Sequence, residues 1–191
     1  MVQAARQLIR ERGYHATAFS LVLKRSEAPR GSVYFHFPGG KTQLVMEAAE
    51  AHAHEQVEII DRAAQEAGSV TALIELYFDL GRDGMTASGY ARGCGIAPLV
   101  TEGAGLESEE LSETGRRAFS EMTDRLAFHF VAFGVEPAAA RSLAGAVVAG
   151  IEGAMVTSRA LRSPAPFDSV RDALVSHGAG LPPKGSARGS D

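Results

Sequence analysis

The amino-acid sequence predicts an all-α protein. Along most of the chain, apolar residues recur three or four positions apart, which is the spacing of an amphipathic helix. The strict alternation that marks a strand is nearly absent, and glycines and prolines divide the periodic stretches into about nine helices. With 191 residues and 45% apolar content, the chain is long enough for one domain, or for two small ones sharing a core.

Three short helices are predicted first. The first has an apolar face from Val2 to Ile9 and ends at Gly13, and the second covers residues 19–25. The third is expected to begin at Pro29, because the missing N–H of proline suits the first turn of a helix. Pro38 and the two glycines after it should end this helix.

Longer helices are predicted in the rest of the chain. Ser69 is placed to cap one of them, whereas five glycines between residues 81 and 95 predict a loop or a broken helix. The tail from Gly178 is rich in glycine, proline and serine and is expected to be disordered. The predicted long helices cover residues 42–67, 109–133 and 138–161, and a final short one covers 167–175.

Charge is distributed unevenly along the chain. The formal net charge is -4, which by itself argues against a nucleic-acid partner. Residues 1–50, however, hold seven Lys and Arg against four Asp and Glu, a net of +3, which leaves -7 for the remainder. Such asymmetry suggests a basic binding module joined to a different body.

The first three predicted helices have the dimensions of a helix-turn-helix, in which the second helix of the pair enters the DNA major groove. The candidate recognition helix spans residues 29–37, with Val33 and Phe37 facing inward. Arg30 suits a guanine or a phosphate, and Lys41 follows where a phosphate contact is expected. The alternative is a small helical subdomain whose aromatic residues all belong to a core.

Residues 13–44, GYHATAFSLVLKRSEAPRGSVYFHFPGGKTQL, resemble the DNA-binding signature of TetR-family transcriptional repressors, and the match extends over roughly residues 2–50. The resemblance implies an N-terminal DNA-binding domain, residues 1–45, of a bacterial regulator. Phe35 departs from the polar or hydroxylated aromatic residue usual at its position, which predicts weak base reading there. The positions that match DNA contacts of the family are Thr17, Arg30, Gly31, Ser32, Tyr34, Phe35, His36 and Lys41.

Residues 46–177 are predicted to form a body that binds a ligand and dimerises, followed by the tail at 178–191. The stretch from Arg92 to Ala97 and the helix ending near Phe167 resemble the LmrA/YxaF-like subgroup of the same family. Aromatic and methionine residues of this body are candidates for a mostly apolar effector pocket, although a residue of this kind more often belongs to a core. The candidates are Tyr77, Phe78, Met85, Phe119, Met122, Phe128, His129 and Met155.

Small residues form a stripe on the penultimate predicted helix. A glycine inside a soluble helix costs about 1 kcal/mol relative to alanine, so close helix–helix approach should offset that cost. The resemblance implies a homodimer built by the last two helices, and packing within one chain is the alternative. The stripe consists of Ala146, Gly150, Gly153, Ala154 and Thr157.

Other classes of function lack support in the sequence. Nucleophile, metalloprotease and phosphate-loop motifs are missing or incomplete, so we predict neither an enzyme nor a cofactor or metal site. Apolar runs are too short for a membrane span, and the single cysteine, Cys94, fits a reducing, cytoplasmic setting. We therefore predict a repressor that binds a palindromic double-stranded operator as a homodimer and is released by a small molecule. The alternative is an all-α ligand-binding or redox-sensing protein acting through Cys94.

Overall fold

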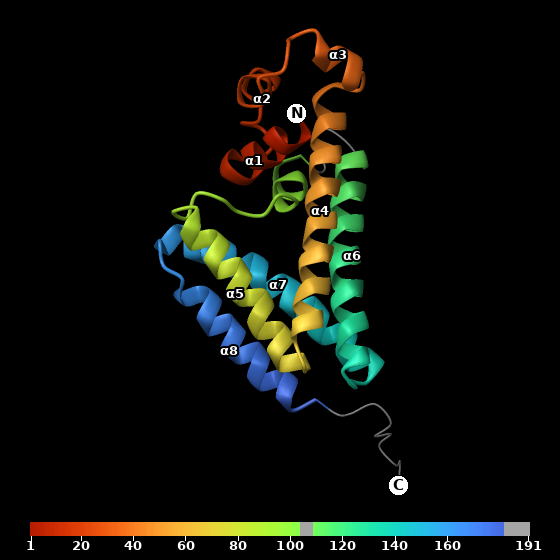
Figure 1. The fold of residues 1–191 in the computed structure, drawn as a ribbon, viewed down its shortest axis with the longest axis vertical. Coiled ribbons are helices and arrows are strands. Elements are labelled where there is room, and N and C mark those ends of the chain that lie inside the picture. Colours follow the sequence, from red (N-terminus) through yellow and green to blue (C-terminus); the bar gives the residue numbers. More distant parts are fainter. Residues whose placement is uncertain (104–108, 182–191) are drawn as a thin grey trace. The chain divides into compact units, whose positions relative to one another are not determined.

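The computed structural model describes residues 1–103 and 109–181, so residues 182–191 of the predicted disordered tail lie outside this part. The all-α prediction is confirmed: the described residues form eight α-helices and one short π-helical segment, η1, without a strand (Figure 1). The elements are α1 Val2–Arg12, α2 Phe19–Ser26, α3 Ser32–His36, α4 Gly40–Glu66, α5 Val70–Ala87, η1 Leu99–Gly103, α6 Glu109–Ala132, α7 Pro137–Leu161 and α8 Ala165–Ala179.

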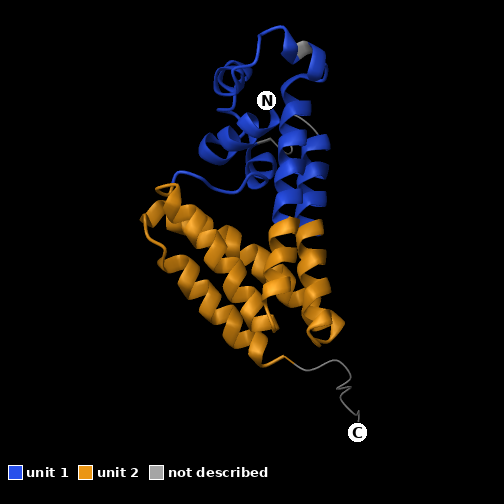
Figure 2. Ribbon diagram, in the orientation of Figure 1, with its two compact units in different colours: residues 1–56, 91–120 blue, residues 57–90, 121–191 orange. Residues whose placement is uncertain are grey.

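The chain divides into two compact units, coloured separately in Figure 2. Unit 1 contains Met1–Gln56 and Ala91–Ser120, and unit 2 contains Val57–Tyr90 and the described residues from Glu121 onward. Helices α4 and α6 therefore contribute to both units. The boundary predicted at residue 45 falls inside α4, and the segment 91–120 groups with the first helices rather than with the rest of the predicted body.

Unit 1 is built around the predicted apolar face of α1. Ala5, Leu8 and Ile9 are buried there against residues of α2 and α4. Leu99 of η1 and Leu111 of α6 belong to the same core and are also fully buried. The second half of the chain thus supplies part of the core that supports the first three helices.

In unit 2, α5 packs against α7 and α8. The prediction of a loop or a broken helix from residue 81 is wrong for its first part, because α5 continues through Gly81 and Gly84 to Ala87. A Cβ atom at Gly81 would lie 3.0 Å from a methyl of Ile151 and 3.1 Å from the Phe167 ring. Gly81 therefore allows α5, α7 and α8 to approach closely. In the sequence alone, the same glycine resembles a helix breaker.

Two further helix boundaries involve glycine or serine. Ser69 caps α5 as predicted, since its side-chain oxygen accepts a hydrogen bond of 3.2 Å from the Ala72 N–H. The final helix is longer than predicted and continues through Gly178 to Ala179. Gly178 is buried, and a Cβ there would contact Ile74 and Val70 of α5. Packing against α5 thus extends α8 beyond the end that composition suggested.

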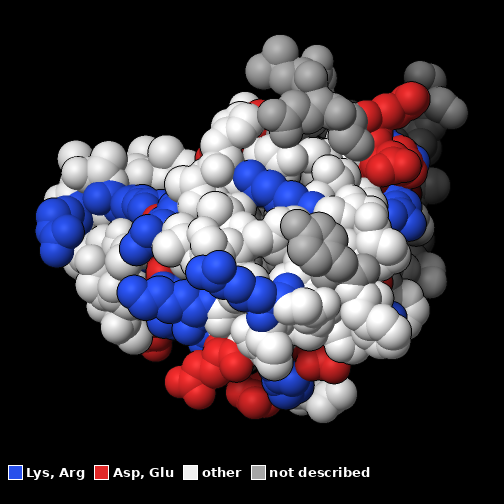
Figure 3. Space-filling model, turned by 90° about the horizontal axis from the view of Figure 1, so that it is seen from above, with Lys and Arg blue, Asp and Glu red and all other residues white. Residues whose placement is uncertain are grey.

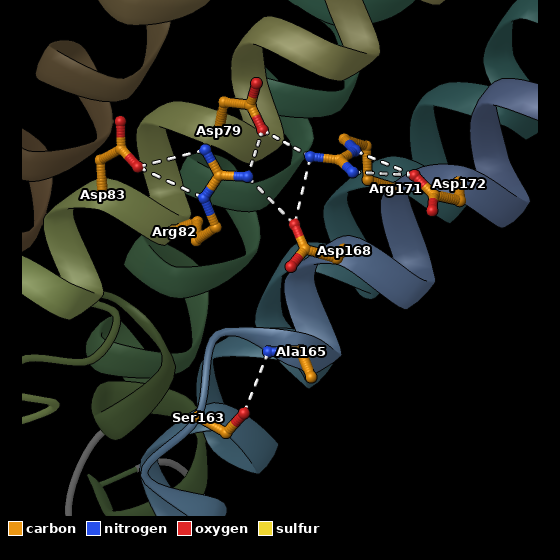
Figure 4. A network of polar contacts seen from close by, with 8 residues as sticks. All are labelled: Asp79, Arg82, Asp83, Ser163, Ala165, Asp168, Arg171 and Asp172. Atoms are coloured by element: carbon orange, nitrogen blue, oxygen red, sulfur yellow. Dashed lines mark hydrogen bonds and ion pairs between the residues drawn. The ribbon is translucent and has the colours of Figure 1, made fainter.

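Arginines join α5 to α8 on the surface of unit 2 (Figure 4). Arg82 lies 3.0 Å from both Asp79 and Asp168, and Arg171 lies 2.7 Å from Asp79 and 3.2 Å from Asp168. Asp172 also pairs with Arg171, at 3.0 Å. Each arginine thus links carboxylates from both helices, so the network stabilises one arrangement of the pair.

Removing one arginine from this network should have a modest effect. We expect Arg171→Ala to lower the free energy of unfolding by about 1 kcal/mol or less, because partly exposed ion pairs contribute little individually. Urea denaturation at low and high salt measures this loss, which should shrink as salt rises. Arg116→Ala is the matched control, because the ion pair of Arg116 with Glu113 lies along a single helix; an equal loss in the control would contradict the prediction.

Helix α7 is long and apolar enough to cross a membrane by length and composition alone, although 39% of the relevant window is buried inside the protein. Its buried positions include Leu143, Val147 and Ile151, which pack within unit 2. Burial in the helical core of unit 2 accounts for the apolar character of α7 at these positions.

Candidate nucleic-acid interface

The turn between α2 and α3 sets the geometry of the predicted helix-turn-helix. Glu27 ends α2 in the left-handed conformation, with φ of 54°. The prediction that α3 begins at Pro29 is wrong, because the first helical residue is Ser32. Its N–H and its hydroxyl donate to the Pro29 carbonyl at 3.0 and 2.6 Å, which closes a turn ahead of the helix. Arg30 and Gly31 therefore lie in the turn, immediately before α3.

The short helix α3 has one buried and one exposed side. Val33 and Phe37 are buried, as predicted. Phe35 is 82% exposed and His36 is also exposed, with their rings 5.1 Å apart in an edge-to-face arrangement. An aromatic ring this exposed on a helix is available for apolar contact with a thymine methyl group.

Basic side chains accompany this surface. Figure 3 shows Lys and Arg side chains spread over the face of the molecule that is seen from above. Lys24, Arg25 and Arg30 are exposed on α2 and in the turn after it, and Arg25 lies 2.8 Å from Glu11. Lys24 and Arg30 line a groove together with Phe19, Ser20, Leu23, Ala28 and Val33.

Lys24 and Ser20 were not among the DNA contacts predicted from the sequence. Their four-residue separation on α2, with a basic last turn, was the available signal. The structure adds them by placing both on the groove that Arg30 also lines.

Lys41 lies in the first turn of α4 and is oriented by the turn after α1. Its ammonium group is 3.3 Å from the His15 carbonyl oxygen and 4.3 Å from the centre of the Tyr14 ring. The cation–π contact and the hydrogen bond together hold this side chain against the turn. Its charge is thereby placed beside the start of α4, where the sequence predicts a phosphate contact.

Thr17 differs from the other predicted DNA contacts. Its side chain is 1% exposed, and its hydroxyl donates a 2.7 Å hydrogen bond to the Gly13 carbonyl. Its backbone N–H donates to the Tyr14 carbonyl. In this structure the Thr17 side chain stabilises the connection between α1 and α2 instead of facing outward.

A buried histidine lies deeper in unit 1. His52 is 3% exposed, and its ring is covered by the backbone at Gly95, where an added Cβ would be only 2.6 Å away. Burial lowers the pKa of His52, and the nearby Glu55 carboxylate, 3.5 Å from Nδ1, opposes this shift only in part. His52 is therefore neutral at pH 7.

Because the pKa of His52 is lower in the folded than in the unfolded state, acid should destabilise the protein. Below about pH 6.5 the unfolded chain gains a proton that the folded chain does not, so stability falls by at most about 1.4 kcal/mol per pH unit for this group. Urea denaturation between pH 7.5 and 5 measures the slope. We expect His52→Gln to flatten it, and equal slopes in both proteins would contradict the prediction.

The predicted effector residues are spread over α5, α6 and α7 and belong to both units. Tyr77, Phe78 and Met85 are buried along α5 in unit 2, and Met122 is buried on α6. Met155 is half-buried on α7. Phe119 is half-buried and belongs to unit 1, whereas Phe128 is 61% exposed.

His129 takes part in an ion-pair cluster. Its Nε2 atom lies 2.7 Å from Asp61 Oδ1, and Arg125 donates two hydrogen bonds to the same carboxylate, at 2.6 and 2.5 Å. Arg125 first, and then His129, hold the pKa of Asp61 below its ordinary value, against the opposing effect of burial. In this arrangement His129 is a partner of a carboxylate on α4.

The small-residue stripe of α7 divides between two roles. Ala154 is fully buried, and a Cβ at Gly150 would lie 2.8 Å from Val170 of α8, so these two positions serve packing within the chain. Ala146, Gly153 and Thr157 are exposed. A Cβ at Gly153 would meet no atom within 4 Å, so packing within the described part of the chain does not account for that glycine.

Cys94 is buried, and its sulfur accepts hydrogen bonds from the N–H groups of Ile96 and Ala97 at 3.2 and 3.4 Å. These contacts give the thiol a structural role at the start of the turn that leads into η1. The redox alternative based on this residue gains no separate support from them.

A helix-turn-helix carried on an all-helical body, with basic and aromatic side chains exposed on one face, defines a DNA-binding transcriptional regulator. Residues 1–48 match the tetR family of bacterial regulatory proteins, and residues 70–173 match the LmrA/YxaF-like C-terminal domain of transcriptional regulators. The chain belongs to the TetR family of transcriptional regulators.

Relatives and solved structures agree with this assignment. The chain is 38% identical to the HTH-type transcriptional regulator Rv0196 of Mycobacterium tuberculosis over 91% of this chain and 90% of that one. Identity to the regulator LmrA of Bacillus subtilis is 27%, covering 87% and 88%. The fold is similar to a TetR regulatory protein from Rhodobacter sphaeroides, with a TM-score of 0.81, 24% identity and coverage of 92% and 95%. It also resembles CifR bound to a 26-bp operator, with a TM-score of 0.77, 16% identity and coverage of 95% and 94%.

Proposed function

We propose that this regulator is a homodimeric repressor that binds a palindromic operator and is released by a small, mostly apolar molecule. The observation that carries the DNA-binding part is the exposed surface formed by the recognition helix α3 and the turn before it. There Arg30, Phe35 and His36 are exposed, while Val33 and Phe37 anchor the same helix in the core. The guanidinium of Arg30, the phenyl ring of Phe35 and the imidazole of His36 are groups suited to contacts with base edges and phosphates.

The exposed part of the α7 stripe supports a dimer. Ala146 and Gly153 would let a second helix approach closely, and the exposed side chains of Val156 and Leu161, 69% and 68% accessible, would gain burial. A two-fold dimer that places its recognition helices about 34–36 Å apart reads a palindrome in successive turns of the groove.

Release by an effector requires a state of the body that disfavours DNA binding. A ligand that binds this state more tightly lowers operator affinity by the ratio of its two affinities. The apolar side chains along α5, among them Tyr77, Phe78 and Met85, support an uncharged or weakly polar ligand. Like other regulators of this type, the protein is proposed to act in the cytoplasm.

The test is fluorescence anisotropy with labelled DNA from the region upstream of the protein's own gene. We expect the binding constant to exceed that for scrambled DNA of equal length by about 10³-fold or more, and to fall steeply with salt. Sedimentation measures the dimer in the same buffer, and a panel of apolar compounds tests release. Equal affinity for operator and scrambled DNA would reject sequence-specific binding, and a monomer at working concentration would reject the dimer.

A further inference from the structure

Residues 91–103, here called the strap, hold the C-terminal end of α1. The Nε–H of Arg10 donates to the Gly93 carbonyl, and the Gly93 N–H donates to the Arg10 carbonyl, both at 2.9 Å. Farther along, Leu99 is fully buried in the core that α1 and α4 share. These contacts join the strap to the first helices of unit 1 by both hydrogen bonds and burial.

The last described part of the strap reaches the turn after α1 through Glu102. One carboxylate oxygen of Glu102 accepts a 3.1 Å hydrogen bond from the His15 N–H. The His15 ring lies 2.9 Å from the Glu102 carbonyl oxygen through Nε2, and because a carbonyl only accepts, Nε2 carries the hydrogen. The Glu102 carboxylate covers Gly13, where a Cβ would overlap it and where φ is +85°. Gly13 therefore serves the turn and leaves room for Glu102.

The same turn residue contacts a predicted DNA-binding side chain. The His15 carbonyl accepts the hydrogen bond from Lys41 Nζ at 3.3 Å, and the neighbouring Tyr14 ring lies under the same ammonium group. His15 thus bridges Glu102 and Lys41 through its backbone and its ring. A shift of this turn moves the acceptor that orients Lys41.

We propose that Glu102 is a positioning residue for operator binding, which holds the turn at residues 13–17 so that Lys41 is oriented toward a phosphate. This inference rests on the proposed function and adds a site of regulation to it. A change that withdraws Glu102 from this turn would loosen the turn and weaken the Lys41 contact.

The sign of the expected effect separates this proposal from simple electrostatics. Removing a negative charge from a DNA-binding unit ordinarily strengthens binding. If Glu102 positions Lys41, Glu102→Ala instead weakens operator binding by about three- to tenfold, and the slope of log affinity against log salt falls by about one per protomer. Glu102→Gln should stay within about twofold of wild type, because its amide oxygen still accepts from the His15 N–H.

The controls use the same chain and the same DNA. Glu109→Ala removes an exposed charge from unit 1 and should leave affinity unchanged or raise it. In a double-mutant cycle, Lys41→Ala should cost less than twofold when Glu102 is already alanine, because the two residues act through one turn. Additive losses, or unchanged or tighter binding by Glu102→Ala, would overturn the proposal.

A second measurement does not depend on DNA. Amide hydrogen exchange at His15 should become about tenfold faster or more in Glu102→Ala and remain slow in Glu102→Gln, since this N–H donates to the carboxylate. Unchanged exchange in Glu102→Ala would overturn the inference even if DNA binding were altered. A wild-type protein that fails to bind the operator would instead reject the proposed function, so the two failures are distinguishable.

Discussion

Phe78→Ala is expected to lower the free energy of unfolding by about 3–5 kcal/mol, the range for removing a fully buried aromatic ring. Phe78 is 0% exposed on α5, and its ring lies 3.5 Å from the position that a Cβ of Gly150 would occupy on α7. The cavity would open where the backbone of α7 comes close, so collapse around it is restricted. Urea denaturation measures the loss, and the melting temperature should fall by about 6–20 °C.

The matched control for Phe78 is on the same helix. Leu80 is 52% exposed, and Leu80→Ala should change stability by no more than about 0.5 kcal/mol. The comparison also decides between the two interpretations of Phe78 that the sequence left open. If Phe78→Ala kept wild-type stability but lost the response to an effector, Phe78 would line a ligand cavity and the core assignment would be wrong.

Arg30→Ala is expected to weaken operator binding by at least about tenfold. A guanidinium that contacts a base edge or a phosphate contributes about 1–3 kcal/mol, and a dimer loses this contact at both half-sites. Arg30 is exposed in the turn before α3 and lines the groove with Lys24. Anisotropy titrations over a range of salt concentrations distinguish its role: a phosphate contact lowers the salt slope, whereas a base contact relaxes sequence preference.

Arg62→Ala provides the control for Arg30. Arg62 is on α4 in unit 2, is 61% exposed and pairs with Glu58 one helical turn away. Its removal changes the net charge equally and should leave operator affinity within about twofold of wild type. Equal losses in both variants would show that Arg30 contributes only general charge, and a loss of the dimer in Arg30→Ala would assign it a structural role.

Much of the site could be predicted because its signals are local. The inward positions of Val33 and Phe37, the exposed Arg30 and the cap at Ser69 follow from spacing and residue type within one or two turns. The start of α3 was harder to predict from the sequence, because Pro29 suits the first turn of a helix and the turn before a helix equally well. The hydrogen bonds of Ser32 to Pro29 decided between them.

Contacts between residues far apart in the sequence could not be predicted from local patterns. Thr17 has a hydroxyl group that could contact DNA, but in the structure its side chain is buried and the hydroxyl donates a hydrogen bond to the Gly13 carbonyl. Gly81 resembles a helix breaker, yet α7 and α8 pack so closely on α5 that only a glycine fits without displacing a side chain. Nothing near Glu102 in the sequence indicates that it meets His15, 87 positions away.

By itself, the sequence determined the helical class, most helix boundaries, and the basic reading module that a net charge of -4 conceals, because periodicity and charge are properties of short segments. Tertiary structure alone decided which segments share a core. It placed residues 91–120 with the first helices and divided the α7 stripe between inward and outward positions. The physical reason is that burial and close approach depend on partners far along the chain, which local spacing does not specify.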